Sequence, residues 1–335
     1  MRDVMNDLAS RENHSGLPPV VSLGLPVYNG ERFVAQAIQS VLKQTFGDFE
    51  LLIFDNASAD ATETICRELA AEDRRVKYIR NPINIGASPN FNLALSRARG
   101  KYFKWVAHDD VLHADYLKEC VAALDATPDA VQCQSDLEYI DEEGKSIGVT
   151  PWRLERAGSV DVVHRFGAMT LRSHNCYDIM GLFRRDVLAG APLQSFHGAD
   201  RTLLVKMATL GPFVHVYRPL LQVRDFSGRY SRSKSRPSDR ARWHDTRISG
   251  RVSFPHWKLY RTYWDVVREM PVSLVDKMRA TGVLFAWWFV HWNGVKMAVD
   301  LLGVVAPDVV GFAERFKQRY ISPAPGIDEI RRRST

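Results

Sequence analysis

The fold is decided by the stretch Tyr102-Phe103-Lys104-Trp105-Val106-Ala107-His108-Asp109-Asp110-Val111, in which an apolar run ends in two adjacent carboxylates. A short apolar run that follows a glycine, here Gly100, is typical of a buried strand. Its end would lie at the carboxyl edge of a sheet, where open α/β folds bind their ligands. Two adjacent carboxylates repel each other unless a positive group neutralises them, and a divalent metal that holds a diphosphate would do so. The stretch therefore indicates chemistry on a nucleotide-activated substrate.

The residues on either side of this stretch alternate between strand and helix patterns. Apolar, β-branched runs predict strands, and apolar positions three or four residues apart predict helices. The predicted strands are 20–27, 49–54, 76–79, 102–107 and 130–135, and the predicted helices are 31–43, 61–71, 88–98 and 114–124. Ser58 is the expected N-cap of the second helix. This order predicts an α/β fold with a doubly wound, mainly parallel sheet flanked by helices.

The second half of the chain is less regular. Residues 141–145 look like a hairpin turn, and the stretch that follows, up to residue 175, shows no clear period. Further expected elements are a strand at 177–183, a helix at 199–210 that ends before Gly211, and a short strand at 213–217. Residues 227–251 are rich in Ser and Arg, and we expect a loop there.

Composition and charge set broad limits. The chain has 335 residues, of which 45% are hydrophobic and 25% charged, as in an ordinary globular protein. Its four cysteines lack metal-ligand spacing, which favours reduced structural thiols. Residues 1–150 carry 15 Lys and Arg against 23 Asp and Glu, a net charge of −8, and residues 151–335 carry 30 against 16, a net charge of +14. A basic second half suits a diphosphate, an anionic lipid surface or a nucleic acid, or is simply a solvated surface.

The two ends of the chain differ from the middle. Residues 1–18 are polar and lack the apolar core of a signal peptide, so we expect a disordered lead-in. Residues 226–335 are expected to form a basic loop and a helical C-terminal region. Within it, residues 280–295 are uncharged and include three tryptophans, but they fall short of the ~20 residues that a spanning helix needs. Two interpretations stay open: a helix packed on the main domain or on a dimer partner, or an interfacial helix lying on a membrane.

Three more polar segments follow predicted strands. Residues 25–30, Leu-Pro-Val-Tyr-Asn-Gly, form a turn whose Tyr28 or Asn29 can contact a base at the sheet edge. Residues 53–58, Ile-Phe-Asp-Asn-Ala-Ser, place Asp55 where it either hydrogen-bonds a ribose or caps the next helix. Residues 80–90 contain Asn84 and Gly86 before a helix start, where an anion is favoured.

These segments together resemble the family 2 glycosyltransferases, which have the GT-A fold and act with inversion. The family pattern has P-x-Y-N after the first strand, D-(D/N)-x-S after the second, N-x-G before the third helix and an acidic D-x-D-type motif after the fourth. The resemblance covers residues 19–225. It implies that residues 19–140 form a nucleotide-sugar half and residues 141–225 an acceptor half.

The resemblance also implies roles for individual residues. Pro26, Tyr28, Asn29 and Asp55 would contact the nucleoside, and Asn84 and Gly86 would shape the base and ribose side. Asp109 and Asp110 match the acidic motif and would hold Mg²⁺ or Mn²⁺. Because Ala107 stands two residues before Asp109, the sequence departs from the strict D-x-D form. We assign Asp110 to the metal, and Asp109 to the ribose or the metal.

Two further elements come from the acceptor half. The family has an acidic pair at a helix start, and here Asp200 would be the general base while Ala199 replaces the preceding Glu. Downstream, Arg224 matches the arginine of an Arg-x-His element, but the histidine is missing. Arg229 could supply positive charge to the donor diphosphate from a loop that closes over it.

The resemblance therefore implies a metal-dependent glycosyltransferase that moves a sugar from a nucleotide diphosphate to a hydroxyl acceptor. The expected partners are a nucleotide-sugar donor, with a UDP-sugar as the first candidate, and a glycan or lipid-linked acceptor, with a possible inner-membrane surface. The expected location is the cytoplasm, with peripheral contact to the membrane. A nucleotidyltransferase and a catalytically degenerate binding scaffold stay open as alternatives. No nucleic-acid partner is expected, because the basic residues form no recognisable module.

Overall fold

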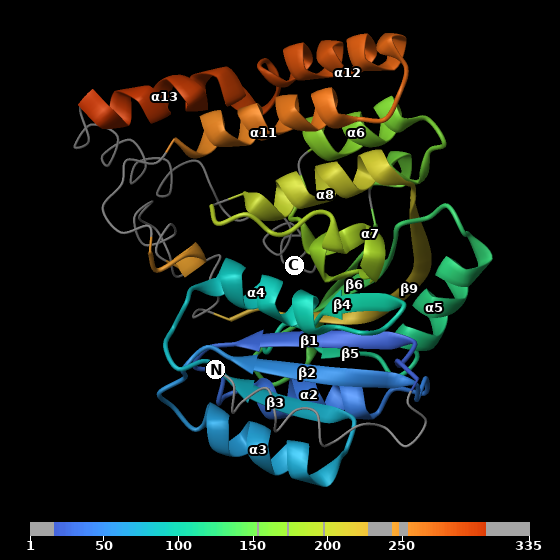
Figure 1. The fold of residues 1–335 in the computed structure, drawn as a ribbon, viewed down its shortest axis with the longest axis vertical. Helices are drawn as coiled ribbons and strands as arrows, with labels where there is room; N and C mark the ends of the chain where they lie inside the picture. The colour runs from blue at the N-terminus through green and yellow to red at the C-terminus, as the bar shows by residue number, and fades with distance from the viewer. Residues whose placement is uncertain are drawn as a thin grey trace.

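The computed structural model describes residues 17–152, 154–172, 174–196, 198–226, 243–247 and 254–305. Their strands form one nine-stranded sheet with the order β3-β2-β1-β4-β8-β6-β9-β5, and β7 pairs with β6. Helices cover both faces of this sheet, and the C-terminal helices form a further layer at one end of the molecule (Figure 1). The α/β class and the helical C-terminal region are confirmed.

The first half follows the predicted alternation. Strands β1 to β4 pair in parallel, and the bounds differ from those predicted by at most two residues. Leu51 and Ile53 of β2 pack into a core with α2, α3 and α5, whereas Leu52 and Phe54 face α4 on the other side. The elements are β1 (Val21–Val27), α2 (Val34–Leu42), β2 (Phe49–Asp55), α3 (Thr62–Glu72), β3 (Val76–Arg80), α4 (Ala87–Arg97), β4 (Tyr102–Trp105), β5 (Val111–Leu112) and α5 (Tyr116–Ala126).

The second half of the sheet is mixed rather than parallel. Strand β8 inserts between β4 and β6 and is antiparallel to both, while β9 is parallel to β6. The strand predicted at 177–183 is shorter, since its first part is a 3-10 turn, and the strand predicted at 213–217 continues to Arg224. These elements are β6 (Gln132–Ile140), β7 (Ser146–Thr150), η2 (Tyr177–Met180), β8 (Leu182–Arg184), α7 (Arg185–Ala189), α8 (Ala199–Leu210) and β9 (Phe213–Arg224). The hairpin turn at 141–145 is confirmed between β6 and β7.

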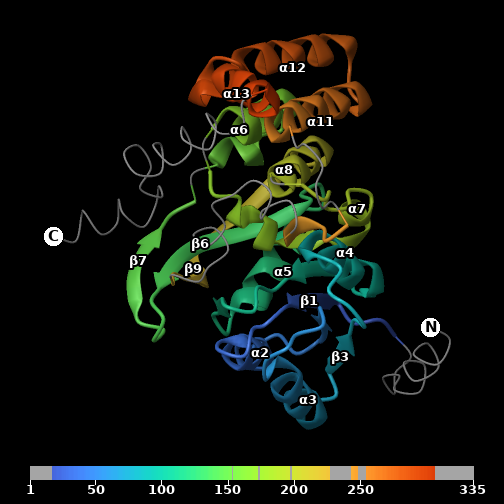
Figure 2. The same cartoon turned by 90° about the vertical axis from the view of Figure 1, so that its left-hand side faces the viewer.

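Helices stack above the second, mixed half of the sheet. The short turn η1 (Glu155–Gly158) leads into α6 (Val162–Leu171), which packs on α8 and α12, and α11 (Pro255–Glu269) also packs on α8. The chain then forms α12 (Leu274–Trp287), the turn η3 (Val290–Trp292) and α13 (Asn293–Val305). In two views at right angles these last helices form the outermost layer, at the opposite end of the molecule from β1 to β3 and α3 (Figure 2).

The tryptophan-rich segment 280–295 is not one helix. The backbone breaks at His291 and Trp292, which both have positive φ, so α12 and α13 are separate. Trp287 is buried and stacks on Tyr260 of α11. Among the described residues, no helix has the length and apolar character needed to cross a membrane. One side of the segment is thus packed on the main domain, as the first interpretation predicts.

Candidate active site

The turn after β1 is held against the loop after β2. Asn29 has φ of 52°, and its N–H donates to Ser58 Oγ at 2.9 Å, while its Oδ1 accepts from Ala59 N–H at 2.9 Å. The N-cap predicted at Ser58 is therefore wrong, because its hydroxyl serves this turn and α3 begins at Thr62. Pro26 is buried in β1, whereas Tyr28 is 46% exposed at the sheet edge. Tyr28 can thus contact a ligand directly, whereas the buried position of Pro26 argues against direct contact.

Asp55, at the end of β2, organises this edge. It is fully buried, and its Oδ1 accepts from Ser58 N–H at 2.8 Å. Its Oδ2 accepts from Tyr78 Oη at 2.6 Å and from Arg80 Nη1 at 2.7 Å. Burial raises the pKa of Tyr78, and the Asp55 carboxylate raises it further, so this hydroxyl stays a donor. In this structure Asp55 anchors the loop and caps no helix.

An asparagine network follows β2 and β3, and the motif comparison missed most of it. Asn56 Nδ2 donates to Asn84 Oδ1 at 2.9 Å and to the Gly86 carbonyl at 3.2 Å. Its Oδ1 accepts from Asn81 Nδ2 at 3.1 Å and from Ile85 N–H at 3.0 Å. Amide side chains that use both donor and acceptor atoms fix a loop in one conformation. The network therefore presents the Asn84-to-Gly86 turn as a rigid wall.

Residues 243–247 pack on this wall. Gly86 has φ of 89°, and a Cβ there would lie 2.7 Å from Asp245 Cα and 2.8 Å from the His244 carbonyl oxygen. His244 Nδ1 lies 3.2 Å from Ser88 Oγ, and Thr246 Oγ1 donates to the Asn84 carbonyl at 3.2 Å. Only glycine satisfies both the backbone angle and this close approach. A segment far along the chain thus closes one side of the edge.

The acidic pair lies across the edge from this wall, in the turn after β4. Asp109 and Asp110 are 8% and 4% exposed. Asp110 Oδ1 accepts from the Arg224 N–H at 3.0 Å, and the Asp109 carbonyl accepts from Arg224 Nε at 3.0 Å. A Cβ on Gly30 would lie 2.8 Å from the His108 ring, so the first and fourth motifs are in direct contact. The His108 ring therefore packs against the turn after β1.

Arg224, at the end of β9, has a different environment from the one its predicted role suggests. Its side chain is fully buried, and its Nη1 donates to the carbonyls of Asp141 and Glu142, each at 2.9 Å. Its Nη2 donates to Gln36, and its guanidinium lies 4.5 Å from the Phe33 ring centroid. Arg224 thus joins α2, the hairpin turn and the acidic pair. Arg229, the other predicted diphosphate contact, lies outside the described residues.

A buried lysine lies beneath the acidic pair. Lys104 of β4 is 1% exposed, donates to the Met180 carbonyl and lies 4.5 Å from the Tyr116 ring centroid. Burial lowers its pKa to about 7, although Asp110 and other groups oppose that shift. Its side chain lines a small cavity together with Asp110. Lys104 therefore supports the floor of the site from inside the sheet.

Asp200 stands in the first turn of α8 and is partly exposed. The loop before α8 is fixed on α4, because Asn92 and Leu193 exchange two hydrogen bonds of 2.8 Å. Hydrogen bonds from Arg247, with a smaller contribution from Ser195 of this loop, lower the pKa of Asp245 to about 2. The loop before Asp200 is thereby connected to the Asn84-to-Gly86 wall.

The residues around Asp200 are mostly buried. Asp200 Oδ1 accepts from the Arg201 N–H at 2.8 Å, and Arg201 Nη2 donates to the His174 carbonyl at 3.1 Å. Burial, aided by Arg201, lowers the pKa of His174 to about 4, so this ring is neutral. His174 is half-buried, and its Nε2 lies 3.1 Å from the Met169 carbonyl oxygen, which favours packing over contact with an acceptor. Asn175 is exposed beside it.

Comparison with known protein families shows which proteins this chain is similar to. The family model described as glycosyl transferase family 2 matches residues 22–189. A Haemophilus influenzae protein described as an uncharacterized glycosyltransferase is 30% identical over 125 residues, which cover 37% of this chain and 39% of that one. The chondroitin synthase of Escherichia coli is 27% identical over 202 residues, which cover 59% of this chain and 28% of that one. The match thus spans less than half of each curated relative.

Solved structures show the same fold. S. aureus TarS in complex with UDP-GlcNAc superposes with a TM-score of 0.60 at 17% identity, over 82% of this chain and 74% of that one. The mannosyltransferase PcManGT from Pyrobaculum calidifontis, in complex with GDP-Man and Mn²⁺, has a TM-score of 0.51 at 16% identity, over 92% of this chain and 89% of that one. With a family match over half of its length and a GT-A-type fold, the chain belongs to glycosyl transferase family 2.

Proposed function

We propose that this protein is a metal-dependent, inverting glycosyltransferase that transfers a sugar from a nucleotide diphosphate to a hydroxyl acceptor. The donor class follows from the family, and a UDP-sugar is the first donor to test. The acceptor would be a glycan or a lipid-linked glycan, used in synthesis at the cytoplasmic face of a membrane. The observation that carries the proposal is the meeting of Tyr28, Asp55, the Asn84-to-Gly86 wall and the Asp109-Asp110 pair at one edge of the sheet.

The acidic pair fits a divalent metal that is shared with the donor. The described residues contain no group of three or more Asp, Glu, His or Cys side chains that could hold a metal alone. Mg²⁺ in such sites takes one or two carboxylates, and phosphate oxygens and waters complete its octahedron. Asp110 and Asp109 provide two carboxylates in a turn that Arg224 holds, through its N–H at Asp110 Oδ1 and its Nε at the Asp109 main-chain carbonyl. When bound, the metal would neutralise negative charge on the leaving diphosphate.

The chain's own residues would position the donor and accept a proton. The Asn84-to-Gly86 wall and Tyr28 would hold the nucleoside, with the diphosphate directed toward Asp110. An acceptor hydroxyl would enter beside α8, where Asp200 Oδ would take its proton. The acceptor oxygen would then bond to the anomeric carbon on the face opposite the diphosphate, and the bond from that carbon to the diphosphate oxygen would break, which inverts the centre.

The two arginines of the predicted diphosphate contact would act differently. Arg224 is held by the Asp109, Asp141 and Glu142 carbonyls, so we assign it a positioning role for the acidic pair. Arg229 follows it in a basic stretch of the sequence. We therefore assign the direct contact with the diphosphate to Arg229.

Donor binding and turnover test the proposal together. UDP-, GDP- and dTDP-sugars should be screened for thermal stabilisation with Mn²⁺ or Mg²⁺, because a ligand that binds only the folded state raises its melting temperature. The best donor should then release its nucleoside diphosphate. Asp110→Asn should abolish the metal-dependent part of both signals, whereas Asp129→Asn, at an exposed position before β6, should change neither. Stabilisation without any release of diphosphate would favour the binding-scaffold alternative.

A further inference from the structure

The outermost helix α12 is apolar on the side that faces solvent. Leu274, Met278, Phe285 and Phe289 recur at helical spacing along α12 and its continuation, and each is at least two-thirds exposed. The opposite side of the same helix, with Ala280, Leu284 and Trp287, is buried against the main domain. A helix at a protein surface normally turns polar residues to water. The exposed side of α12 therefore indicates a partner.

The segment that connects α12 to α13 extends the exposed apolar side of α12. His291 and Trp292 have φ of 51° and 58°, an unfavourable conformation for two successive residues with side chains. It is held because His291 Nε2 lies 2.9 Å from the Leu171 carbonyl oxygen and Asn293 Nδ2 donates to the Trp287 carbonyl at 2.9 Å. The result is that Trp292 is 77% exposed. In α13, Val295 and Leu301 are also exposed, three and nine residues further along.

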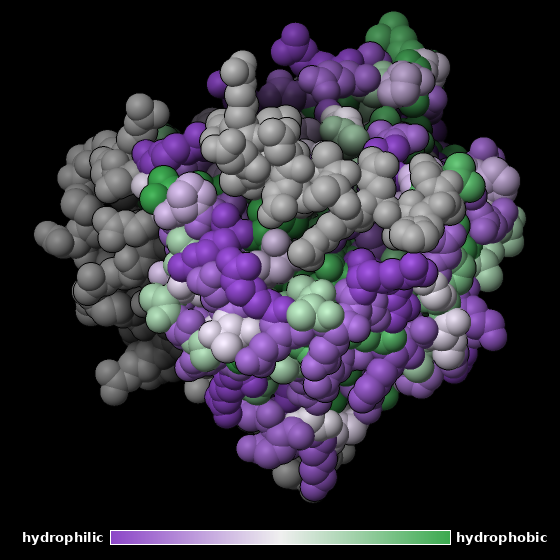
Figure 3. Space-filling view, turned by 60° about the horizontal axis from the view of Figure 1, so that its bottom comes forward, coloured by the Kyte–Doolittle hydropathy of each residue, from purple (hydrophilic) through white to green (hydrophobic). Residues whose placement is uncertain are grey.

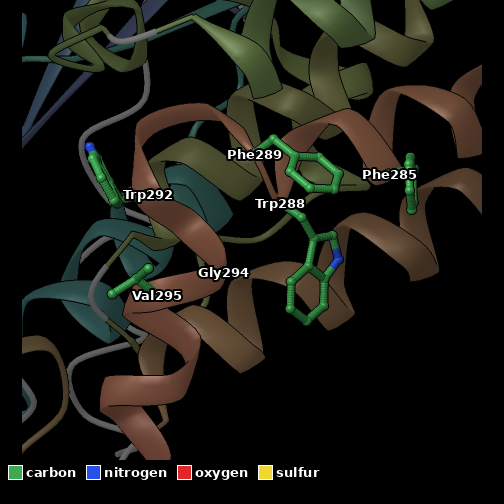
Figure 4. A pocket seen from close by; sticks show the side chains of 6 residues that line it. All are labelled: Phe285, Trp288, Phe289, Trp292, Gly294 and Val295. Atoms are coloured by element: carbon green, nitrogen blue, oxygen red, sulfur yellow. The ribbon is translucent and has the colours of Figure 1, made fainter.

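These side chains surround a groove of about 500 Å³. Figure 4 shows its lining, which runs from the end of α12 through the connection to the first turn of α13. The lining residues are Phe285, Trp288, Phe289, Trp292, Gly294 and Val295, and none of them has a polar side chain other than the tryptophan N–H groups. By contrast, the face seen in Figure 3 is mostly hydrophilic with scattered apolar residues. A contiguous apolar patch on one face marks an interaction site.

We propose that this surface, made of Leu274, Met278, Phe285, Phe289, Trp292 and Val295 and called the α12–α13 face, lies on an anionic lipid bilayer. Phenylalanine and tryptophan side chains are favoured at the boundary between headgroups and acyl chains. Basic sequence lies before α11 and after α13: residues 227–242, 248–253 and 306–335 together carry 13 Lys and Arg against 5 Asp and Glu. That charge complements anionic headgroups.

A lipid surface explains the face better than a second copy of the chain does. Protein interfaces carry about one hydrogen bond per 100–200 Å², but the groove lining offers almost no polar side chains for such bonds. Bilayer contact requires no such partners. Arg268 is paired with Asp265, and Arg279 is paired with Asp161 and Asp276. The positive charge that attracts anionic headgroups would therefore come from the flanking sequence.

The position of the α12–α13 face suggests how an acceptor would reach the proposed active site. The membrane contact is independent of the proposed function, and only the statement about the acceptor rests on it. Helix α11 packs both on α12 and on α8, and α8 carries Asp200 in its first turn. A bilayer on the α12–α13 face would therefore lie beyond the acceptor half, with the donor half away from it (Figures 1 and 2). A lipid-linked hydroxyl could then approach Asp200 from the membrane side.

Vesicle flotation tests the contact. The full-length protein should float with vesicles of phosphatidylcholine and phosphatidylglycerol at low salt, and less with phosphatidylcholine alone. The variant Phe285→Ser/Phe289→Ser/Trp292→Ser should lose at least about tenfold in partitioning, because three apolar side chains no longer leave water. Tyr217→Ser is the matched control, since Tyr217 is 77% exposed on β9, outside this face. It should float like the wild type.

A second measurement needs no variant. Brominated lipids should quench the tryptophan fluorescence of the wild-type protein, because Trp292 would lie at the depth of the bromines. The proposal is overturned if the wild type fails to float with anionic vesicles, if the triple variant floats equally well, or if light scattering shows a dimer that the triple variant abolishes. Release of nucleoside diphosphate without vesicles reports the proposed reaction separately. Its failure alongside normal flotation would count against the reaction and leave the contact supported.

Discussion

Replacing Arg224 by lysine distinguishes a role in positioning the acidic pair from direct contact with the diphosphate. Lysine keeps the positive charge but loses the planar fork of donors. In the structure the Arg224 guanidinium donates to the Asp109, Asp141 and Glu142 carbonyls and to Gln36. A lysine ammonium at the same depth could reach one or two of these acceptors. The others would be left buried without a donor. The main-chain N–H of residue 224 would still bind Asp110 Oδ1, so the acidic pair would lose only the bond to the Asp109 carbonyl.

The expected magnitude follows from those lost contacts. A hydrogen bond from a charged donor contributes about 1.5–3 kcal/mol, and a buried acceptor left unpaired costs about 1–3 kcal/mol. Two lost bonds therefore predict that Arg224→Lys lowers the free energy of unfolding by about 3–5 kcal/mol. That is a large share of the ~5–15 kcal/mol that stabilises an ordinary domain. Urea unfolding, followed by circular dichroism, measures it directly.

Arg218→Lys is the matched control on the same strand. Arg218 is 46% exposed and pairs with Glu119 at 2.7 Å, so the change should cost less than about 1 kcal/mol. With Arg224→Lys, metal-dependent donor binding should weaken together with stability, since the Asp109 carbonyl and the 141–145 hairpin turn lose guanidinium donors. A variant that unfolds within about 1 kcal/mol of the wild type, but needs tenfold more donor, would refute the positioning role. It would instead place Arg224 on the diphosphate.

Three further changes test other parts of the site. Gly86→Ala should lower the free energy of unfolding in urea by about 2–4 kcal/mol, because Gly86 has a positive φ and its Cβ position lies 2.7 Å from Asp245 Cα. Gly282→Ala in α12 is the control: no atom lies within 4 Å of its Cβ position, so the free energy of unfolding should stay the same or rise by up to about 1 kcal/mol. Asp200→Asn should lower kcat by about 10²–10⁴-fold, while the donor Kd measured by calorimetry stays unchanged. Donor binding that weakens by the same factor would contradict the role of Asp200 as the base. Lys104 has a folded pKa of about 7, below its usual 10.5, so the unfolded state binds more protons between these values. The free energy of unfolding of the wild type, relative to Lys104→Met, should therefore rise from pH 7 to pH 10 and stay level below pH 7.

The first half of the chain could be predicted closely because its signals are local. Apart from the two-residue strand β5, each strand and helix up to α5 is specified by its own periodicity, and the turn residues stand at the strand ends. The contacts between these turns could not be predicted, since they depend on the register of the sheet. The hydroxyl of Ser58, expected at a helix N-terminus, is used by the turn at Asn29 across the β1–β2 pair. Asn56 likewise joins residues about 30 positions apart.

The acceptor half was predicted less well, for two physical reasons. Strand β8 is three residues long, and whether so short a strand runs parallel or antiparallel to β4 is set by the chain around it. Helix α6 was missed although it has a local signal: Asp161 Oδ1 accepts from Val163 N–H at 2.7 Å and caps the helix. Val163, Phe166 and Met169 then recur at helical spacing. The roles of Arg224 and Lys104 depend on burial, which the sequence alone does not display.

The parts of the chain that complete the donor edge lie beyond the segment that defines the family. The family match ends at residue 189, yet Arg224 holds the acidic pair and residues 244–246 pack on the Asn84-to-Gly86 wall. Arg224 Nε and Thr246 Oγ1 bind main-chain carbonyls, of Asp109 and Asn84, whereas the Arg224 N–H binds the Asp110 carboxylate. Substitutions in this later part can therefore change the donor site without altering any of the four motifs. Differences in donor choice between relatives with the same motifs should then be sought in the residues that correspond to 224 and 243–247.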